Sequence, residues 1–327
     1  MDKSFEILDQ FRQFMQNRVV LTGAELGIFD LIGKNPGRDV NFLANQLDAD
    51  KRGITRLLDC LVAMDFLEKR EGKYYLNETG EYLTSDHSNT ILPMVLHYVT
   101  LWKNWSNLTE TVKKGRNPNK ILALEDEEST RAFINGMKVI ASKLAEEIVN
   151  FFDASDRKIL LDIGAGPGVY TIYFLKKYPD LKAIIFDLPE VVEIAKENIE
   201  REGLSSRVTF VKGDFYKDPL PTGSDLALLS AIIHQNSPKE NIELYKSIYH
   251  VLDSGGKVLI RDHIMSEDRT YPPAGALFAL NMLVGTPGGD TYTFSEVKDA
   301  LETAGFTKVK LVRKGTKMDC LVEAIKL

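Results

Sequence analysis

The sequence is poor in cysteine and has no long apolar run, and each shortage excludes a class of protein. Its 327 residues include only two cysteines, Cys60 and Cys320, so a disulfide framework or a CxxC metal site does not fit. We expect two buried, reduced thiols and no bound metal. No apolar stretch reaches the ~20 residues of a membrane span, and none resembles the core of a signal peptide. We therefore expect a cytoplasmic protein that does not enter a membrane.

The chain also lacks an excess of basic residues. Its formal net charge is −6 and its pI is about 5.6, whereas a nucleic-acid-binding protein usually carries a clear basic excess. Hydrophobic residues make up 44% of the chain and charged residues 27%, which is ordinary for a globular protein. The length exceeds that of one typical domain and predicts two, one of them large.

The stretch from Lys158 to Asp187 reads as strand, glycine-rich turn, helix and strand. A first apolar run ends at Asp162, and the turn GAGPG (164–168) follows, with Pro167 opening the next helix. A second apolar run ends at Asp187. This order is typical of a nucleotide-binding βαβ unit.

Two glycine motifs are missing from this unit, which narrows the choice of nucleotide. A dinucleotide-binding turn would need glycine at the position of Val169, and a P-loop would need Gly-Lys followed by Ser or Thr. Asp187 lies nineteen residues after Gly168, close to the ~20 expected for an acid that binds ribose. An adenosine without phosphates fits this pattern, and S-adenosylmethionine is the obvious candidate.

From this unit onward, strands and helices alternate regularly, which predicts an α/β fold with a doubly wound, mostly parallel sheet of seven strands. The last two strands are joined by the short turn 314–316, so they should be antiparallel. The expected strands are 159–161, 183–186, 208–211, 226–229, 257–260, 308–312 and 320–325, and the expected helices are 169–178, 189–202, 239–252, 274–283 and 294–304.

The residues before this unit predict a separate winged-helix domain that is all-α apart from one hairpin. Asp39 is placed to cap a short helix, and residues 66–75 predict a β-hairpin with Gly72 in its turn. Apolar residues at helical spacing predict further helices over 4–17, 19–32 and 51–64. The expected domains are a winged-helix dimerisation domain over 1–90, a helical linker with substrate-pocket helices over 91–152, and the nucleotide-binding domain over 153–327.

A winged helix can also bind DNA, through a helix that would here be residues 51–64. Lys51, Arg52 and Arg56 are basic, but three aspartates flank them and most of the helix is apolar. A helix that reads DNA should present polar side chains to base edges and cations to phosphates. We therefore favour packing against a partner chain, and the apolar surplus of the first two helices indicates a homodimer.

Five motifs, in this order, resemble one enzyme family: DIGAGPG, FDLPEV, GDFYKDPLP, the segment around His234, and NMLV followed by TPGGDTYTF. Together they are similar to the plant caffeate-type and animal hydroxyindole-type O-methyltransferases and their bacterial and archaeal relatives. The resemblance covers nearly the whole chain, including the N-terminal dimerisation domain. It implies the class I methyltransferase fold, with S-adenosylmethionine as the methyl donor.

The resemblance also implies which residues hold the cofactor. The glycines of the turn let the backbone approach the methionine part, Asp187 binds the ribose hydroxyls, and Asp214 and Phe215 hold the adenine. These residues follow strands, where ligands bind in such sheets. The expected cofactor-binding residues are Asp162, Gly164, Gly166, Gly168, Asp187, Leu188, Gly213, Asp214, Phe215 and Ser230.

By the same resemblance, His234 is the general base and Asp262 orients it. A sulfonium methyl is already activated, so no metal is needed, and a neutral imidazole with an unperturbed pKa of ~6.5 can take a phenol's proton near neutral pH. A carboxylate on the far ring nitrogen would fix the tautomer and stabilise the imidazolium. Catalysis therefore requires the two side chains to meet.

Three positions depart from the family. The residue after the histidine is usually aspartate and here is Gln235; the plant enzymes carry lysine at the position of Ser230; and a second glutamate is expected where Asp290 and Thr291 stand. One supporting carboxylate is therefore missing. The departures imply a weaker base, a more acidic acceptor, or a substrate other than a simple phenol.

The implied reaction is methyl transfer to a hydroxyl of a small aromatic or polycyclic molecule. Two alternatives stay open: carbon methylation or a lapsed methyltransferase on the same scaffold, and a cofactor-sensing winged-helix regulator. The expected substrate-binding residues are Trp102, Phe133, Met137, Phe278, Asn281 and Met282.

Overall fold

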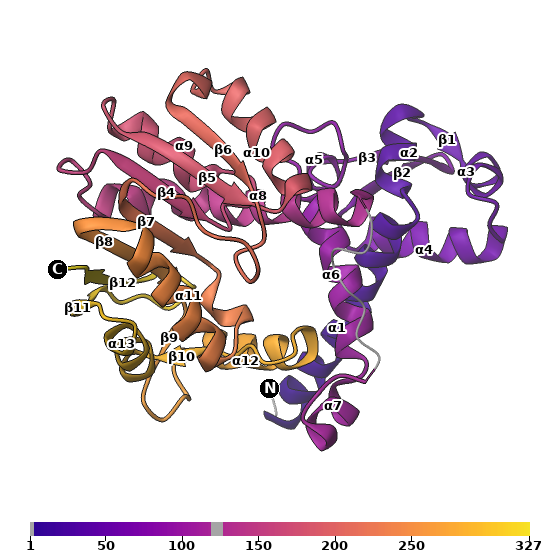
Figure 1. Ribbon diagram of the computed structural model, residues 1–327. Coiled ribbons are helices and arrows are strands. Elements are labelled where there is room, and N and C mark those ends of the chain that lie inside the picture. The colour runs from indigo at the N-terminus through magenta and orange to yellow at the C-terminus, as the bar shows by residue number, and fades with distance from the viewer. Residues whose placement is uncertain (1–2, 119–126) are drawn as a thin grey trace. The chain divides into compact units, whose positions relative to one another are not determined.

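The structure is a computed structural model that describes residues 3–118 and 127–327. The chain divides into two compact units, Met1–Trp102 and Lys103–Leu327 (Figure 1). The division falls inside helix α6 (Leu92–Trp105), while the expected domain boundaries after residues 90 and 152 stay predictions. In the described part of the chain, no helix combines the length and the apolar character that crossing a membrane requires.

The N-terminal unit contains the expected hairpin and two of the expected helices, α3 and α4. The Asp39 carboxylate accepts from the backbone N–H of Phe42 at 2.9 Å and caps α3, as predicted, and Gly72 turns the hairpin with a φ of 73°. Three strands pair antiparallel in the order β1-β3-β2. The elements are α1 (Lys3–Glu25), α2 (Ile28–Lys34), β1 (Arg38–Asp39), α3 (Val40–Gln46), α4 (Lys51–Ala63), β2 (Leu67–Arg70), β3 (Lys73–Leu76) and α5 (Glu78–Glu81).

The prediction of separate helices over 4–17 and 19–32 was wrong. Helix α1 continues without a break to Glu25, because nothing between Asn17 and Val19 stops a helix. The break comes at Gly27, whose φ of 67° is left-handed, and α2 starts at Ile28.

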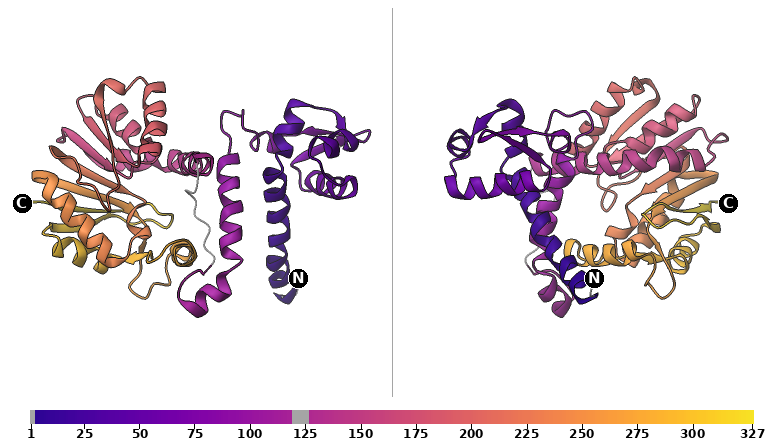
Figure 2. Two further views of the ribbon diagram at one scale, coloured as in Figure 1. Left: turned by 45° about the vertical axis from the view of Figure 1, so that its right-hand side comes forward. Right: turned by 180° about the vertical axis from the view of Figure 1, so that it is seen from behind.

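The amino-terminal half of α1 is apolar and exposed. Its side chains become buried only from Leu21 onward, where α1 packs on the core of the unit. Figure 2 shows the amino-terminal end of α1 extending away from α2, α3 and α4. The exposed apolar side chains of this half are Phe5, Ile7, Leu8, Phe11, Phe14 and Met15.

The second unit is built on the predicted seven-stranded sheet. Its strand order is β11-β12-β8-β7-β4-β5-β6; β8, β7, β4, β5 and β6 are parallel, whereas β12 runs antiparallel to both β8 and β11, as expected for the last pair. The strands are β4 (Ile159–Ile163), β5 (Lys182–Asp187), β6 (Val208–Lys212), β7 (Ser224–Ser230), β8 (Leu252–Asp262), β11 (Thr307–Arg313) and β12 (Cys320–Ile325).

Helices cover both faces of this sheet because its central strands are apolar on both sides. Leu160 and Leu228 face one core with α8, α9 and α10, while their neighbours Leu161 and Leu229 face the other with α11 and α13. The helices of this unit are α7 (Leu108–Lys114), α8 (Glu127–Phe151), α9 (Val169–Lys177), α10 (Pro189–Arg201), α11 (Pro238–Val251), α12 (Pro273–Gly285) and α13 (Phe294–Thr303).

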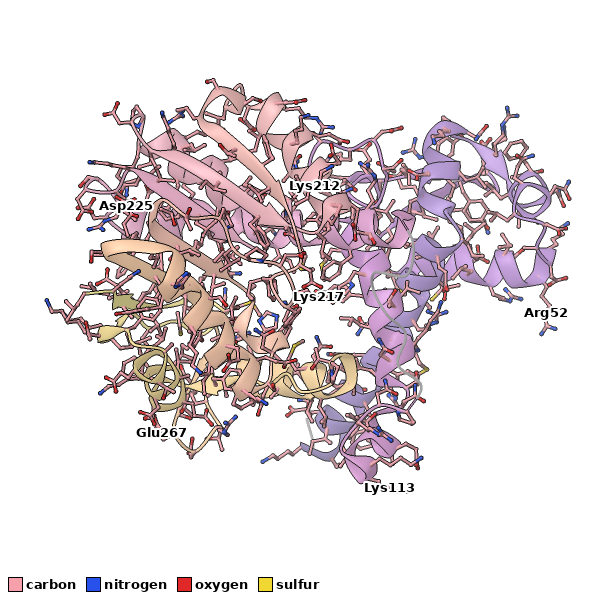
Figure 3. All side chains as sticks on the ribbon, in the orientation of Figure 1. Arg52, Lys113, Lys212, Lys217, Asp225 and Glu267 are labelled. Atoms are coloured by element: carbon pink, nitrogen blue, oxygen red, sulfur yellow. The ribbon has the colours of Figure 1, made fainter. Side chains whose placement is uncertain are left out.

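The two ends of the sheet have different roles. Asp225 lies at the amino end of β7 (Figure 3). Its carboxylate accepts from the backbone N–H groups of Lys158 and Ile159 and so joins the start of β4 to β7. At the other end, a short parallel pair, β9 (Ile264–Met265) with β10 (Tyr292–Thr293), brings the segment after α12 back beside the end of β8. The predicted cofactor-binding and catalytic residues lie at or just after the carboxyl ends of β4, β5, β6, β7 and β8.

The cysteines differ in burial. Cys320 is buried in β12, whereas Cys60 on α4 is only half-buried, which corrects the expectation of two buried thiols. Both are free thiols. Cys60 packs beside Met64, with 3.9 Å between the two sulfur atoms.

Candidate active site

The glycine turn follows β4 and leads into α9. Gly164, Gly166 and Gly168 all have positive φ angles, of 66°, 55° and 75°, which side chains rarely adopt. Gly168 is the N-cap of α9, so the helix begins at Val169 and not at Pro167. A Cβ at Gly164 would come within 2.4 Å of Ile232, whereas a Cβ at Gly166 would meet nothing within 4 Å. The turn thus leaves open space beside Gly166.

Asp187 ends β5 and faces this turn. Its carboxylate accepts from the backbone N–H of Gly166 at 2.7 Å and of Leu188 at 2.7 Å. Burial raises the pKa of Asp187 to about 6, although these two N–H groups oppose the rise. The predicted ribose acid and the second glycine of the turn are therefore in direct contact.

Asp162 lies on β4, one residue before its end. Its carboxylate is 1% exposed and accepts from the Thr171 hydroxyl of α9 at 2.6 Å. Burial raises its pKa to about 7, with Thr171 opposing the rise and Asp187 adding to it. In this structure Asp162 ties α9 to the sheet, and its contact with a cofactor stays a prediction.

The predicted adenine residues form a loop after β6. Gly213 donates its backbone N–H to the Asp187 carbonyl at 2.9 Å, so the loop begins beside the ribose acid. The Asp214 carboxylate accepts from the backbone N–H of Tyr216 at 2.9 Å and pairs with Lys217 at 2.8 Å. Burial would raise the pKa of Asp214, but these two partners hold it below its ordinary value. A Cβ at Gly164 would lie 3.5 Å from the Phe215 ring, so that ring borders the glycine turn.

His234 and Asp262 lie together, as the sequence predicted. Nδ1 of His234 is 2.9 Å and 3.0 Å from the two carboxylate oxygens of Asp262. Burial would raise the pKa of Asp262, but the charge and hydrogen bond of His234, the charge of Arg261 and the backbone N–H of His263 hold it below its ordinary value. An ionised Asp262 fixes the proton of His234 on Nδ1 and leaves Nε2 free to accept one.

Helix α12 brings one predicted substrate residue to the histidine. The Phe278 ring packs edge-on to His234, with 4.9 Å between ring centroids. Asn281 accepts from the indole N–H of Trp105 at 2.8 Å, and Met282 is buried. On α8, Phe133 is half-buried and packs with the cluster of Ile134, Val191 and Ile194 that also contacts Leu188.

The other two predicted substrate residues, Met137 and Trp102, lie on α8 and α6. Met137 is half-buried one turn after Phe133 on α8. Trp102 belongs to the N-terminal unit, where its ring lies 5.8 Å from the Arg18 guanidinium. Their roles as substrate contacts stay predictions.

Two residues beside the site were missed from the sequence. Trp105 reaches Asn281, and only its position in the helical linker pointed to it. His263 is buried, accepts from the backbone N–H of Met318 at 3.2 Å and lies 5.2 Å from the Phe278 ring. Burial lowers the pKa of His263, although the charge of Asp262 opposes this. A signal for His263 existed, because it directly follows Asp262.

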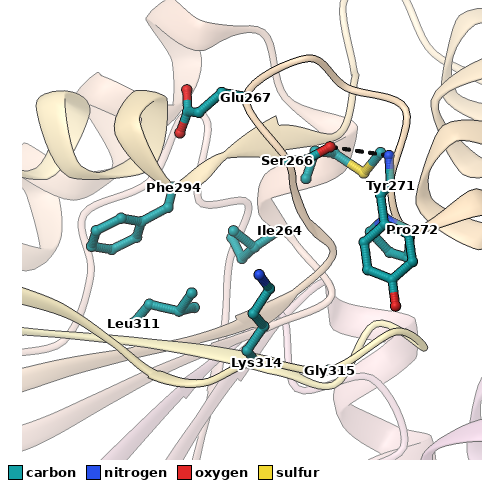
Figure 4. A pocket seen from close by; sticks show the side chains of 10 residues that line it. Ile264, Ser266, Glu267, Tyr271, Pro272, Phe294, Leu311, Lys314 and Gly315 are labelled. Atoms are coloured by element: carbon teal, nitrogen blue, oxygen red, sulfur yellow. Dashed lines mark hydrogen bonds between the residues drawn. The ribbon is translucent and has the colours of Figure 1, made fainter.

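A pocket of about 310 Å³ lies between β9, the loop after it and β11 (Figure 4). The Lys314 side chain reaches into it between Ile264 and Leu311, and Ser266 accepts from the backbone N–H of Tyr271 at its rim. Neither His234, Asp262 nor any predicted cofactor residue lines this pocket. His234 and Asp262 therefore lie outside this pocket.

The chain is similar to proteins of known activity over nearly its whole length. The family model of the O-methyltransferase domain matches residues 105–307, and that of the O-methyltransferase dimerisation domain matches residues 8–86. Acetylserotonin O-methyltransferase of Gallus gallus is 33% identical over 94% of this chain and 94% of its own length. 3-hydroxy-5-methyl-1-naphthoate 3-O-methyltransferase of Streptomyces sahachiroi is 33% identical over 90% of this chain and 87% of its own length.

A solved structure shows the same fold. The crystal structure of human N-acetylserotonin methyltransferase in complex with SAM aligns with a TM-score of 0.83 at 29% identity. The alignment covers 100% of this chain and 98% of that chain. The agreement therefore extends over both units.

Proposed function

The chain belongs to the family of S-adenosylmethionine-dependent O-methyltransferases, and we propose that His234, oriented by Asp262, removes the proton from a hydroxyl of its aromatic acceptor. The observation that carries this proposal is the contact between Nδ1 of His234 and the Asp262 carboxylate at 2.9 Å. The relatives named for acetylserotonin and for a hydroxylated methylnaphthoate support a small aromatic or polycyclic acceptor.

The residues of the second unit fit the cofactor. Gly166 combines a positive φ with open space at its Cβ position, which leaves room for a ligand against the backbone. Among the described residues, the Asp187 carboxylate accepts two backbone hydrogen bonds, so it has lone pairs left for the ribose hydroxyls. Phe215 and Asp214 would hold the adenine beyond it. When bound, S-adenosylmethionine supplies a methyl group that is already activated on a positively charged sulfur.

His234 would act through its free nitrogen. Since Asp262 holds the Nδ1 proton, Nε2 can accept the proton of an acceptor hydroxyl that lies within hydrogen-bonding distance of it. The imidazolium that forms is stabilised by the buried carboxylate behind it. Phe278 packs against the ring and restricts its rotation, so the base meets the acceptor in one orientation.

The second carboxylate of the family is absent from this site. Asp290 pairs with Arg269 at 3.1 Å, and the Thr291 hydroxyl donates to the Gly275 carbonyl at 3.3 Å. The Asp290 backbone N–H donates to the His234 carbonyl at 2.9 Å, but among the described residues neither side chain bonds to the His234 ring, which bonds to Asp262. We therefore expect an acceptor whose hydroxyl is more acidic than that of a simple phenol.

We further propose that the enzyme works as a homodimer through its N-terminal unit. The match to the dimerisation domain includes most of α1. The exposed side chains of Ile7, Leu8, Phe11, Phe14 and Met15 fall within one stripe of the helix at 100° per residue. A stripe of this kind normally packs against another chain.

His234→Ala tests the assigned base. We expect the variant to bind S-adenosylmethionine in calorimetry with unchanged affinity, and to lose at least a hundredfold in transfer to hydroxylated acceptors, because general-base catalysis contributes on the order of 10²–10⁴. The acceptor would be found first by screening phenols, indoles and polyketides with a labelled cofactor. Retained turnover in the variant would contradict the proposal and favour carbon methylation.

A further inference from the structure

Arg261 is a buried cation with few partners. It lies on β8, one residue before Asp262, and is 5% exposed. Its Nε donates to the Ser230 hydroxyl at 2.7 Å and its Nη1 donates to the Met318 carbonyl at 2.7 Å. Nη2 donates to no group in the described ranges, and both acceptors are neutral.

The acid that follows Arg261 and the acid that follows its acceptor Met318 are already paired. Asp262 is bonded to His234 at 2.9 Å, and Asp319 pairs with Arg313 at 3.2 Å. No carboxylate of residues 3–118 or 127–327 forms an ion pair with Arg261. The charges of Arg261 and Asp262 act on each other without a direct ion pair, so a directly bonded anion would further stabilise the buried guanidinium.

An unsatisfied hydroxyl lies beside this guanidinium. The Tyr170 ring is 5.0 Å from the guanidinium carbon of Arg261. The residue is 6% exposed, and its hydroxyl has no hydrogen-bond partner in the part of the chain that the structure describes. Burial raises the pKa of Tyr170 and so keeps the phenol neutral and able to donate, although the charge of Arg261 and the Ser230 hydroxyl oppose the rise. Nη2 of Arg261 and the Tyr170 hydroxyl are thus two neighbouring donors without an acceptor among the described residues.

Arg261 and Tyr170 lie at the same edge of the sheet as the predicted cofactor site. Along the sheet the order is β8, β7, β4, β5 and β6. Asp187 on β5 and Phe215 after β6 would hold the ribose and adenine, so the amino-acid end of the cofactor must run the other way, across β4 toward β7. Two strand spacings, about 10 Å, separate β5 from β7. Ser230 ends β7, and Tyr170 lies in the first turn of α9, directly after the glycine turn.

We propose that Arg261 and Tyr170 form a subsite for the carboxylate of the cofactor's methionine part. Nη2 of Arg261 and the Tyr170 hydroxyl are the free donors, and Ser230 holds the guanidinium at the strand end. A charge-assisted hydrogen bond from arginine to carboxylate satisfies the buried charge and selects a ligand that carries the acid. This inference rests on the proposed placement of S-adenosylmethionine.

The subsite is tested by comparing two ligands that differ only in the carboxylate, S-adenosylmethionine and its decarboxylated form. We expect the wild type to bind the acid at least tenfold more tightly, a difference of about 1.4 kcal/mol. In Arg261→Gln this preference should fall to less than threefold. In Tyr170→Phe, which keeps the ring and its packing, it should fall by about half on a logarithmic scale. The ratio of the two dissociation constants separates the carboxylate contact from a general loss of structure, which would weaken both ligands alike.

Arg207→Gln is the matched control. Arg207 also donates to backbone carbonyls, those of Leu175, Tyr178, Pro179 and Leu181, but at the far end of α9. It should lower the melting temperature without changing the preference between the two ligands. An unchanged preference in both Arg261→Gln and Tyr170→Phe would overturn the subsite alone. Failure of the wild type to bind either ligand would overturn the proposed function and the subsite with it.

Discussion

At the scale of residues, the site contains two buried acids that the cofactor would stabilise. Asp162 and Asp187 each lie against the glycine turn or the helix after it, and burial raises the pKa of the first to about 7 and of the second to about 6. A ligand that brings hydroxyl donors and a positive sulfur favours their ionised forms. Binding should therefore release protons below pH 7.

Asp162 also makes stability depend on pH. Its folded pKa lies above the unfolded value of 3.8, so between about pH 4 and pH 7 the folded state binds more protons, and stability falls as pH rises through this window. The free energy of unfolding of Asp162→Asn, measured in urea without ligand and compared with that of the wild type, should rise by about 2 kcal/mol between pH 5 and pH 7.5. The variant retains an acceptor for Thr171. A difference between the two proteins that does not change with pH would show that Asp162 titrates normally.

At the scale of elements, the turn that carries His234 is held by a buried network. Asn241 on α11 donates to the Ile233 carbonyl at 2.9 Å and accepts from the Asn236 amide at 3.0 Å. The Tyr216 hydroxyl donates to the Asn236 side chain and the Tyr292 hydroxyl donates to its carbonyl. The loop after β6, the turn that carries His234 and β10 are thereby joined.

Loss of this network should displace the base. We expect Asn241→Ala to lower the free energy of unfolding by about 1–3 kcal/mol, because it leaves buried polar groups without partners. It should reduce kcat tenfold or more while changing the affinity for S-adenosylmethionine less than threefold. Asn150→Ala, at an exposed position of α8, is the control and should change none of the three. A loss confined to stability, with kcat unchanged, would separate the network from catalysis.

At the scale of the whole molecule, the proposed homodimer would form through the stripe of exposed apolar side chains on α1. Phe11 is 70% exposed and Phe14 is 57% exposed in the single chain. In a homodimer these rings would be covered, and charges placed there would oppose association.

The double variant Phe11→Glu with Phe14→Glu should therefore behave as a monomer in analytical ultracentrifugation at micromolar concentration, where the wild type should sediment as a dimer. Gln10→Glu, on the same helix but outside the stripe, should stay dimeric. A wild type that is monomeric, or a double variant that stays dimeric, would contradict assembly through this surface.

The sequence by itself determined what depends on neighbours along the chain. The glycine turn, the cap at Asp39, the alternation of strands and helices and the acids at strand ends are local patterns, and the structure contains each of them. The extent of α1 and the burial of Cys60 were misread, because apolar spacing alone shows neither where a helix stops nor how far packing covers a side chain.

Tertiary structure decided which distant residues meet. His234 and Asp262 are separated by 28 positions, and their 2.9 Å contact exists because β7 and β8 are paired in one register. The same pairing sets Arg261 against Ser230, and α9 then brings the Tyr170 ring to the guanidinium. No spacing rule along one chain shows such contacts, since they follow from how separate elements pack.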